Sequence, residues 1–337
     1  MPVILRREDG EESRRRKRAT VLAFAVACVL FATIAPAHDV ATFSIVARDP
    51  QTGEMGVAVA SRFFSVGSVV PYARAGAGAV ATQANANTTY GPRGLELLER
   101  GANAEETLKV LLRGDDDPSA RQVGIVANDG SSVTYTGPKC NSWAGGRSGP
   151  NYAVQGNILA GEQVVAALEK TFFETKGTLA HRMYEALLAG DAAGGDSRGR
   201  QSAAMIIVKQ GAGYNGGNDR AIDIRVDDHP DPFKELGRLL NYAEMNYAWN
   251  EGWTAFTHKH FPEAYTAQQR ALALAPENPE VLYDMAVISL AAGHRDQSMQ
   301  ALQKALTLNP KLKKQASVDH DLDALRNDPA FQRLVAP

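Results

Sequence analysis

Residues 42–62 read TFSIVARDPQTGEMGVAVASR, and this stretch decides the fold of the region that follows. Its two apolar segments, Thr42–Arg48 and Gly56–Arg62, flank the stretch DPQTG at 49–53, which has the composition of a turn. Apolar segments on both sides of such a turn predict a β-hairpin. The folded region is therefore expected to begin with two antiparallel strands.

Similar patterns continue as far as residue 230. A strand of small residues is expected at Gly76–Gln83, and a short strand at Tyr152–Gln155. Two further hairpins are expected, with strands at Gln122–Ala127, Ser132–Thr136, Ala203–Lys209 and Ala221–Val226. Helical periodicity covers Tyr90–Arg113, Glu162–Phe173 and Leu179–Leu188. Hairpins combined with paired helices predict an α+β architecture in which helical layers cover the sheets.

The pattern changes to purely helical from Pro232 onward, and it repeats. The stretch ALALAP that begins at Ala271 matches ALTLNP, which begins at Ala305, and 305 − 271 = 34. That period is the tetratricopeptide spacing. Phe233–Met245 is expected to add a leading helix, and 321–331 a closing one. Two repeats are fewer than an independent solenoid needs, so the segment is expected to dock on the first domain or to pair with another chain, as in a homo-oligomer.

Residues 1–37 have the pattern of a secretory signal peptide. A basic cluster at Arg14–Arg18 precedes an apolar run, Ala19–Ile34, and the stretch APA at 35–37 ends the segment. The run is short for a membrane-spanning helix, so cleavage is favoured over an uncleaved anchor. The predicted mature protein is periplasmic or secreted and keeps no membrane span.

Composition excludes several classes of protein. The net charge of the 337-residue chain is −2, which gives no support to nucleic-acid binding. The mature chain would keep one cysteine, Cys140, which is expected to be buried. No zinc-ligand spacing is present, and the loop Gly211–Asn218 precedes a strand and so is no phosphate cradle. No metal or cofactor is therefore expected.

Catalysis without histidine remains open to a threonine at a chain terminus. His181 lies in a predicted helix, and His229 lies in a loop where Asp231 is expected to cap the next helix. A free α-amine with a pKa near 8 can instead take the proton of a neighbouring hydroxyl while that hydroxyl attacks a carbonyl. Thr42 opens the first strand, the position that such a nucleophile requires.

Several blocks of sequence resemble the bacterial domain-of-unknown-function family ten-twenty-eight. The blocks are TFSIVARDP at 42–50, GVAVASRFF at 56–64, GAVATQ at 78–83, YGPRGL at 90–95, VQGN at 154–157 and GDAAGGDSRGRQS at 190–202. The tetratricopeptide-like repeats expected from the 34-residue period are assigned to residues 232–337. For residues 38–231, the resemblance implies an N-terminal-nucleophile-hydrolase-like, four-layer αββα sandwich. It also implies that Thr42 is the nucleophile.

The expected leader cleavage does not by itself free Thr42. A cut after Ala37 leaves His38-Asp39-Val40-Ala41 in front of it, whereas a cut after Ala41 would place Asp39 where a small residue is expected. A second trimming step, or attack of Thr42 on the Ala41 carbonyl, would supply the free amine. Ser44 is expected on the same face as Thr42, with a core hydrogen bond.

Supporting groups are expected around the nucleophile. Gln83, Asn85 and Asn157 carry amides at strand ends, and an amide there can donate to a developing oxyanion. The cation would come from Arg62 or Arg74, because the early strands contain no lysine. Asn157 is assigned to catalysis, and Gln83, Asn85 and Arg62 to substrate binding.

The stretch DSRGRQS at 196–202 is expected to form a loop at the mouth of the pocket. In that loop, Asp196 is assigned to catalysis and Arg200 to substrate binding, and the two would pair or hold a polar substrate. Trp143 would form a wall of the same pocket. Two functions follow as alternatives, an exported amide-bond hydrolase or a non-catalytic periplasmic scaffold that holds a peptide or protein partner on its repeats.

Overall fold

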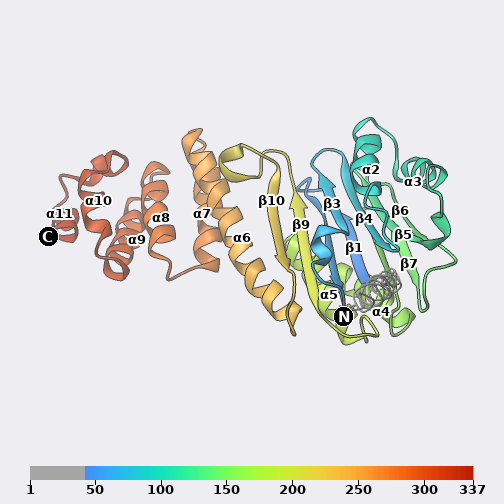
Figure 1. Cartoon of the computed structure of the whole chain (residues 1–337). Helices are drawn as coiled ribbons and strands as arrows, with labels where there is room; N and C mark the ends of the chain where they lie inside the picture. The colour runs from blue at the N-terminus through green and yellow to red at the C-terminus, as the bar shows by residue number, and fades with distance from the viewer. Residues whose placement is uncertain (1–41, 337) are drawn as a thin grey trace, which may run out of the picture. The chain divides into compact units, whose positions relative to one another are not determined.

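The computed structural model describes residues 42–336, which belong to one compact unit. The expected signal peptide lies outside the described residues. None of the described helices is long and apolar enough to cross a membrane. Two antiparallel sheets and two helix pairs come first in the chain, and a series of helices follows (Figure 1).

The larger sheet has six strands in the order β10-β9-β2-β1-β8-β7, so that β1 lies in its interior. The hairpin expected from residues 42–62 is confirmed, because β1 pairs antiparallel with β2 from Thr42 opposite Ser61 to Arg48 opposite Met55. The strands are β1 (Thr42–Arg48), β2 (Met55–Ser61), β7 (Gly145–Gly149), β8 (Tyr152–Asn157), β9 (Ser202–Val208) and β10 (Arg220–Val226).

The smaller sheet has four strands in the order β3-β4-β5-β6. Its strands are β3 (Pro71–Arg74), β4 (Gly78–Ala84), β5 (Arg121–Ala127) and β6 (Ser132–Thr136). Strands β3 and β7 were not expected from the sequence. Pro71 opens an edge strand, where its missing N–H costs no ladder bond, and β7 reads GGRSG without any apolar signal.

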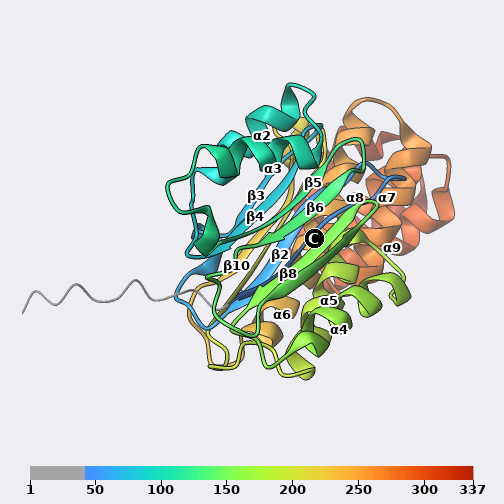
Figure 2. The same cartoon turned by 90° about the vertical axis from the view of Figure 1, so that its right-hand side faces the viewer.

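Helices cover the outer face of each sheet, which gives the four layers of an αββα sandwich (Figure 2). Helices α2 (Tyr90–Glu99) and α3 (Ala104–Arg113) pack on the smaller sheet, and α4 (Glu162–Glu174) and α5 (Leu179–Ala192) pack on the larger one. The helical periodicity expected over Tyr90–Arg113 is confirmed, and it is divided between α2 and α3. Gly101 has a φ of +94°, and Asn103 starts a new helix with a capping box.

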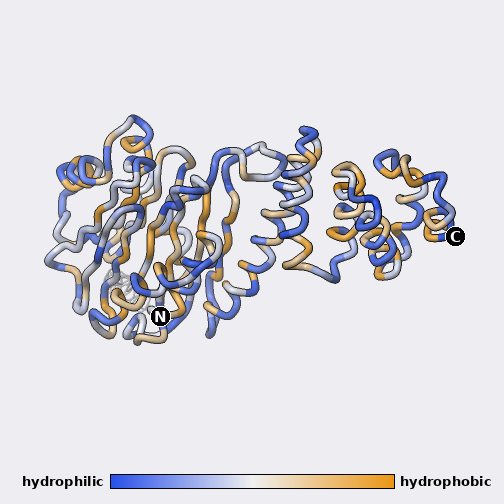
Figure 3. The backbone as a smooth tube through the Cα atoms, turned by 180° about the vertical axis from the view of Figure 1, so that it is seen from behind, coloured by the Kyte–Doolittle hydropathy of each residue, from blue (hydrophilic) through white to orange (hydrophobic). Residues whose placement is uncertain are grey.

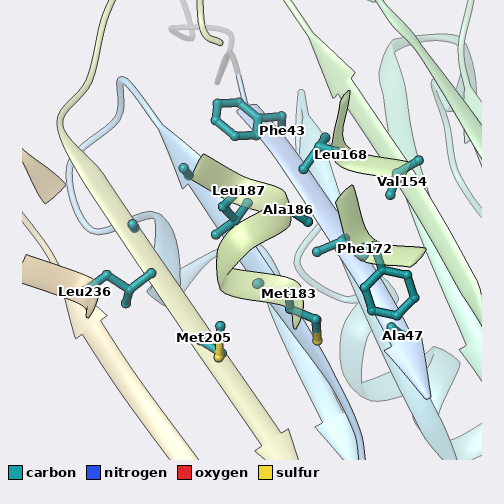
Figure 4. Packing of buried hydrophobic residues seen from close by; sticks show 14 of the residues in the cluster. Phe43, Ala47, Val154, Leu168, Phe172, Met183, Ala186, Leu187, Met205 and Leu236 are labelled. Atoms are coloured by element: carbon teal, nitrogen blue, oxygen red, sulfur yellow. The ribbon is translucent and has the colours of Figure 1, made fainter. Parts of the chain in front are cut away.

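The side chains of β1 alternate between two environments. Phe43, Ile45 and Ala47 face α4 and α5 in a large apolar core, to which Met183 and Leu187 of α5 also belong (Figure 4). Val46 faces the smaller sheet, in a second core between the two sheets. The strands accordingly carry much of the chain's apolar character (Figure 3). Thr42 and Ser44 share the face of Val46, and this places them between the sheets.

The C-terminal helices are α6 (Pro232–Thr257), α7 (Phe261–Leu274), α8 (Pro279–Ala291), α9 (Arg295–Leu308), α10 (Leu312–Val318) and α11 (Pro329–Val335). Four small residues recur at corresponding positions of the repeats and are all buried: Gly252, Ala271, Ala286 and Ala305. Asp231 caps α6 as expected, by accepting a hydrogen bond from the Lys234 N–H at 3.2 Å. The separate leading helix expected over Phe233–Met245 is wrong, because it continues into the first repeat as one 26-residue helix.

Helix α6 joins the sandwich to the repeats. Its first half contributes Phe233, Leu236 and Leu240 to the core beneath the larger sheet. Its second half places Met245 and Ala248 in another apolar cluster, together with residues of α7 and α8. The repeats therefore dock on the first domain, which was one of the two arrangements expected.

Candidate functional site

Thr42 occupies the end of β1, in the middle of the larger sheet. It lies opposite Ser61 of β2 on one side and Asn157 of β8 on the other. Its side chain is fully buried, and its hydroxyl donates to Ser61 Oγ at 3.1 Å. The expected nucleophile therefore sits where three strands end together.

A network of buried amides fills the layer between the sheets next to Thr42. Gln83 Nε2 donates to the Thr42 carbonyl at 3.2 Å and to Gln122 Oε1 at 2.8 Å. Gln83 Oε1 accepts from the Ser44 hydroxyl at 2.6 Å, and Gln155 Nε2 donates to Ser44 Oγ at 2.7 Å. These contacts join both sheets, and they give Ser44 the core hydrogen bond that was expected of it.

Gln122 is the centre of this network. Its Nε2 donates to the Gly156 carbonyl at 2.7 Å and to Thr136 Oγ1 at 2.9 Å. Its Oε1 accepts from Asn157 Nδ2 at 3.0 Å as well as from Gln83. Sequence reasoning missed Gln122, Gln155 and Ser61, although a polar residue at an inward position of an apolar strand is a signal that could have found them.

Asn157 brings an unused acceptor to this end of the sheet. Its Oδ1 is buried and has no hydrogen-bond partner among the described residues. The next residue, Ile158, has a φ of +52°, and Ala84, which follows Gln83, has a φ of +64°. Residues other than glycine are rarely held in this conformation, and such backbone strain tends to cluster at functional sites.

Asp196 lies at the rim of the same strand ends and is 6% exposed. Its carboxylate accepts from the Arg62 backbone N–H at 2.7 Å and from the Arg198 side chain at 3.1 and 3.2 Å. The Arg62 side chain donates to the Arg198 carbonyl at 2.7 Å. Since Arg62 directly follows Ser61, these contacts link the loop at 196–202 to the strand beside Thr42.

Two of the expected supporting residues have other partners. Arg200 pairs with Asp191 rather than with Asp196: its Nε and Nη2 donate to the two Asp191 carboxylate oxygens at 2.8 and 2.6 Å. Asn85 has an exposed side chain, and its backbone carbonyl accepts from Arg121. Thr42, Gln83 and Asn157 are thus brought together, Asp196 and Arg62 lie at the rim, and Arg200 and Asn85 bind elsewhere.

The remaining residues considered from the sequence lie around this centre or away from it. The Trp143 carbonyl accepts from the Leu159 N–H at 3.0 Å, so its loop closes over the end of β8. Arg74 pairs with Glu99 and is not the cation near Thr42. Cys140 is partly exposed rather than buried, and its thiol donates to the Arg121 carbonyl at 3.4 Å.

The side chains between the sheets next to Thr42 are hydroxyls and amides, none of which ionises near neutral pH. A base for Thr42 would therefore have to be the amine of Thr42 itself. Within residues 42–336, no group of three His, Cys, Asp or Glu side chains is arranged to hold a metal ion. The layer can thus orient a hydroxyl and accept a hydrogen bond from an ammonium group.

Comparisons with known proteins agree with this architecture. The model of the "Family of unknown function (DUF1028)" matches residues 42–236, and a tetratricopeptide repeat model matches residues 255–318. A crystal structure of a DUF1028 protein from Silicibacter pomeroyi is similar, with a TM-score of 0.56 and 29% identity over 60% of this chain and 86% of that one. No curated protein matches the chain. The chain therefore belongs to the DUF1028 family and carries tetratricopeptide repeats after the family domain.

Proposed function

We propose that the protein is an exported hydrolase of amide bonds in which Thr42, freed as the N-terminal residue, is the nucleophile. The observation that carries this proposal is the buried, unpartnered Oδ1 of Asn157, which lies opposite Thr42 in the pairing of β1 with β8. An α-ammonium group at Thr42 would give this oxygen a donor. The family match also begins at Thr42, which supports a domain that starts at this residue.

The reaction needs only groups of this chain and water. The Thr42 hydroxyl attacks the carbonyl carbon of the substrate, and the α-amine takes the hydroxyl proton. The C–N bond breaks as that proton passes to the leaving nitrogen, and the acyl group stays on Thr42 as an ester. Water then hydrolyses the ester. The contact with Ser61 fixes the orientation of the hydroxyl, and Asp196 holds the backbone that follows Ser61.

Release of the Thr42 amine requires removal of residues 1–41. We infer that the leader directs export and that a signal peptidase cuts after Ala37. A second trimming step, or attack of Thr42 on the Ala41 carbonyl, then removes the remaining four residues. Cell-wall peptides and N-acylated amino compounds are the amides that an exported enzyme of this kind would meet.

Mass spectrometry of the exported protein provides the first test. A mature chain that begins at Thr42 supports the proposal, whereas active protein that begins at His38 overturns it. Thr42→Ala should abolish hydrolysis of an amide library of both substrate classes, and Thr42→Ser should keep part of it. Thr307→Ala, a matched change at an exposed site on α9, should keep full activity. Unchanged turnover in Thr42→Ala removes Thr42 from the mechanism.

A second role, holding a peptide on the repeats, is favoured by a cavity of about 490 Å³ between α7, α8 and α9. Tyr265, Leu272 and Met285 line it together with the more polar Gln300. Peptide display against the mature chain tests this role. Gln300→Trp, which places a bulky ring in the cavity, should abolish selection of peptides, whereas Thr42→Ala should leave it unchanged. Equal selection by Gln300→Trp would exclude the cavity as the site.

A further inference from the structure

One face of α6 carries four side chains that line a second cavity, remote from Thr42. Asn246, Trp249, Asn250 and Trp253 follow the i, i+3, i+4, i+7 spacing, which puts them on one side of the helix. The cavity has a volume of about 390 Å³, within the range of small-molecule sites. Its other lining residues, Tyr214 from the β9–β10 loop and Asp284 from α8, come from the sandwich and from the repeats.

The loop that carries Tyr214 is fastened to α6. Asn250 Nδ2 donates to the Gly213 carbonyl at 2.8 Å, and the Asn215 N–H donates to Asn250 Oδ1 at 2.8 Å. These two bonds occupy both ends of the Asn250 amide. Tyr214 is nevertheless 87% exposed, and Trp253 is 36% exposed. The fold thus holds aromatic rings in contact with solvent beside the cavity.

Asp284 supplies the charge of this cavity. Trp249 Nε1 donates to Asp284 Oδ2 at 2.7 Å. The charged groups near Asp284 are Glu280 and Asp319, which are negative like Asp284 itself. Among the described residues, no cation balances the Asp284 carboxylate. Burial, together with these two carboxylates, raises the pKa of Asp284 to about 6. At neutral pH the cavity therefore contains a carboxylate that lacks a counter-charge.

We propose that this cavity binds an alkylated ammonium group, such as the head group of choline. Aromatic faces attract cations through their quadrupole, and tryptophan does so best. The Asp284 carboxylate adds the opposite charge at the same place. A neutral sugar suits the cavity less well, because it would leave the Asp284 carboxylate without a counter-charge.

Titration of the full mature chain with choline chloride tests the proposal, with 3,3-dimethyl-1-butanol as the uncharged analogue of the same shape. Two of the chain's three tryptophans line the cavity, so tryptophan fluorescence reports binding, and calorimetry confirms it. Choline should bind at least about ten-fold more tightly than the alcohol, the scale of a desolvated cation–π contact. Equal binding of the two compounds, or no binding of choline, overturns the proposal.

Variants assign the binding to these side chains. Asp284→Asn keeps an acceptor for Trp249 and removes the charge, so it should weaken choline binding about ten-fold or more. Trp253→Leu changes a partly exposed ring and should weaken binding too. Asp296→Asn, an equal change of charge at an exposed site on α9, should have no effect. If Asp284→Asn and Trp253→Leu both fold and bind choline as the unchanged chain does, the cavity is not the site.

Vesicle sedimentation distinguishes the two sources of this head group. Binding of soluble choline without sedimentation on phosphatidylcholine vesicles assigns the site to a free solute. Sedimentation on phosphatidylcholine that excess choline reverses, with none on phosphatidylglycerol, assigns it to a lipid head group. Both results support recognition of the alkylated ammonium group. If the protein binds neither choline nor phosphatidylcholine vesicles, the proposal is refuted.

Discussion

Replacement of Asp284 by asparagine should stabilise the protein above pH 6. The amide has nearly the same shape and keeps an oxygen for Trp249 Nε1, which donates to Asp284 at 2.7 Å. The change removes a charge that burial and the carboxylates of Glu280 and Asp319 oppose. The structure therefore predicts an increase in the free energy of unfolding, rather than the loss that follows most substitutions.

The magnitude follows from the shift in the pKa of Asp284. The pKa of about 6 in the folded chain exceeds the ordinary value of 3.8 by roughly two units. At about 1.4 kcal/mol per unit this gives ~3 kcal/mol, which partial solvent screening reduces to ~1–2 kcal/mol. A carboxyl whose pKa is raised by folding costs stability as the pH rises from about 4 to about 6, and the cost is constant above that range.

Urea unfolding between pH 5 and pH 8, followed by circular dichroism, measures this effect. The variant should exceed the unchanged chain by ~1–2 kcal/mol at pH 8, and the difference should shrink as the pH falls toward 5. Asp296→Asn serves as the control and should show no such trend. A lower stability of Asp284→Asn at pH 8, or a difference that does not change with pH, would refute the reasoning.

Further predictions concern the sandwich. Gly124→Ala should destabilise the fold by ~1–3 kcal/mol in thermal unfolding, because the new Cβ would lie 2.2 Å from Gln155 Oε1 between the sheets. The control Gly114→Ala, whose new Cβ has its nearest neighbour 3.7 Å away, should cost far less. Equal losses of stability in the two variants would contradict the argument. Asp115→Asn should lower the free energy of unfolding by ~3 kcal/mol at pH 7, because it leaves Arg121 without its partner carboxylate. The Asp115 side chain is only 1% exposed. Although burial opposes ionisation, hydrogen bonds from Arg121 and other donors lower the pKa of Asp115, so this contribution is present above about pH 4 and is lost at lower pH. The gap between Asp115→Asn and the unchanged chain in urea unfolding should therefore narrow toward pH 3, and a gap that widens would count against the ion pair.

The sequence predicted the hairpins because their signals are local. In residues 42–62 the apolar alternation and the turn residues lie next to each other, and neither depends on a distant partner. Strand β7 has no such signal, since its five residues include three glycines. It forms because the edge of β8 offers a ladder, and close neighbours such as Trp143 beside Gly145 leave no room for larger side chains.

The candidate site was partly predictable for the same reason. Thr42, Gln83 and Asn157 could be selected because each is a polar residue at a strand end. Gln122 could not be recognised as the common partner of Gln83 and Asn157, because its contact with Asn157 depends on how one sheet packs on the other. The pairing of Arg200 with Asp191 rather than Asp196 depends likewise on the path of a loop, which a pattern of charges does not specify.

Helix α6 contributes to two apolar cores, so the family domain and the repeats are joined by one continuous helix. A truncation at residue 231 would remove Phe233, Leu236 and Leu240 from the core beneath the larger sheet. A fragment that contains only α6 and the repeats would expose the same three apolar side chains to water. Division of the protein between the two regions would thus destabilise both fragments. A force or a ligand that tilts the repeats would therefore also move the first half of α6 against the larger sheet.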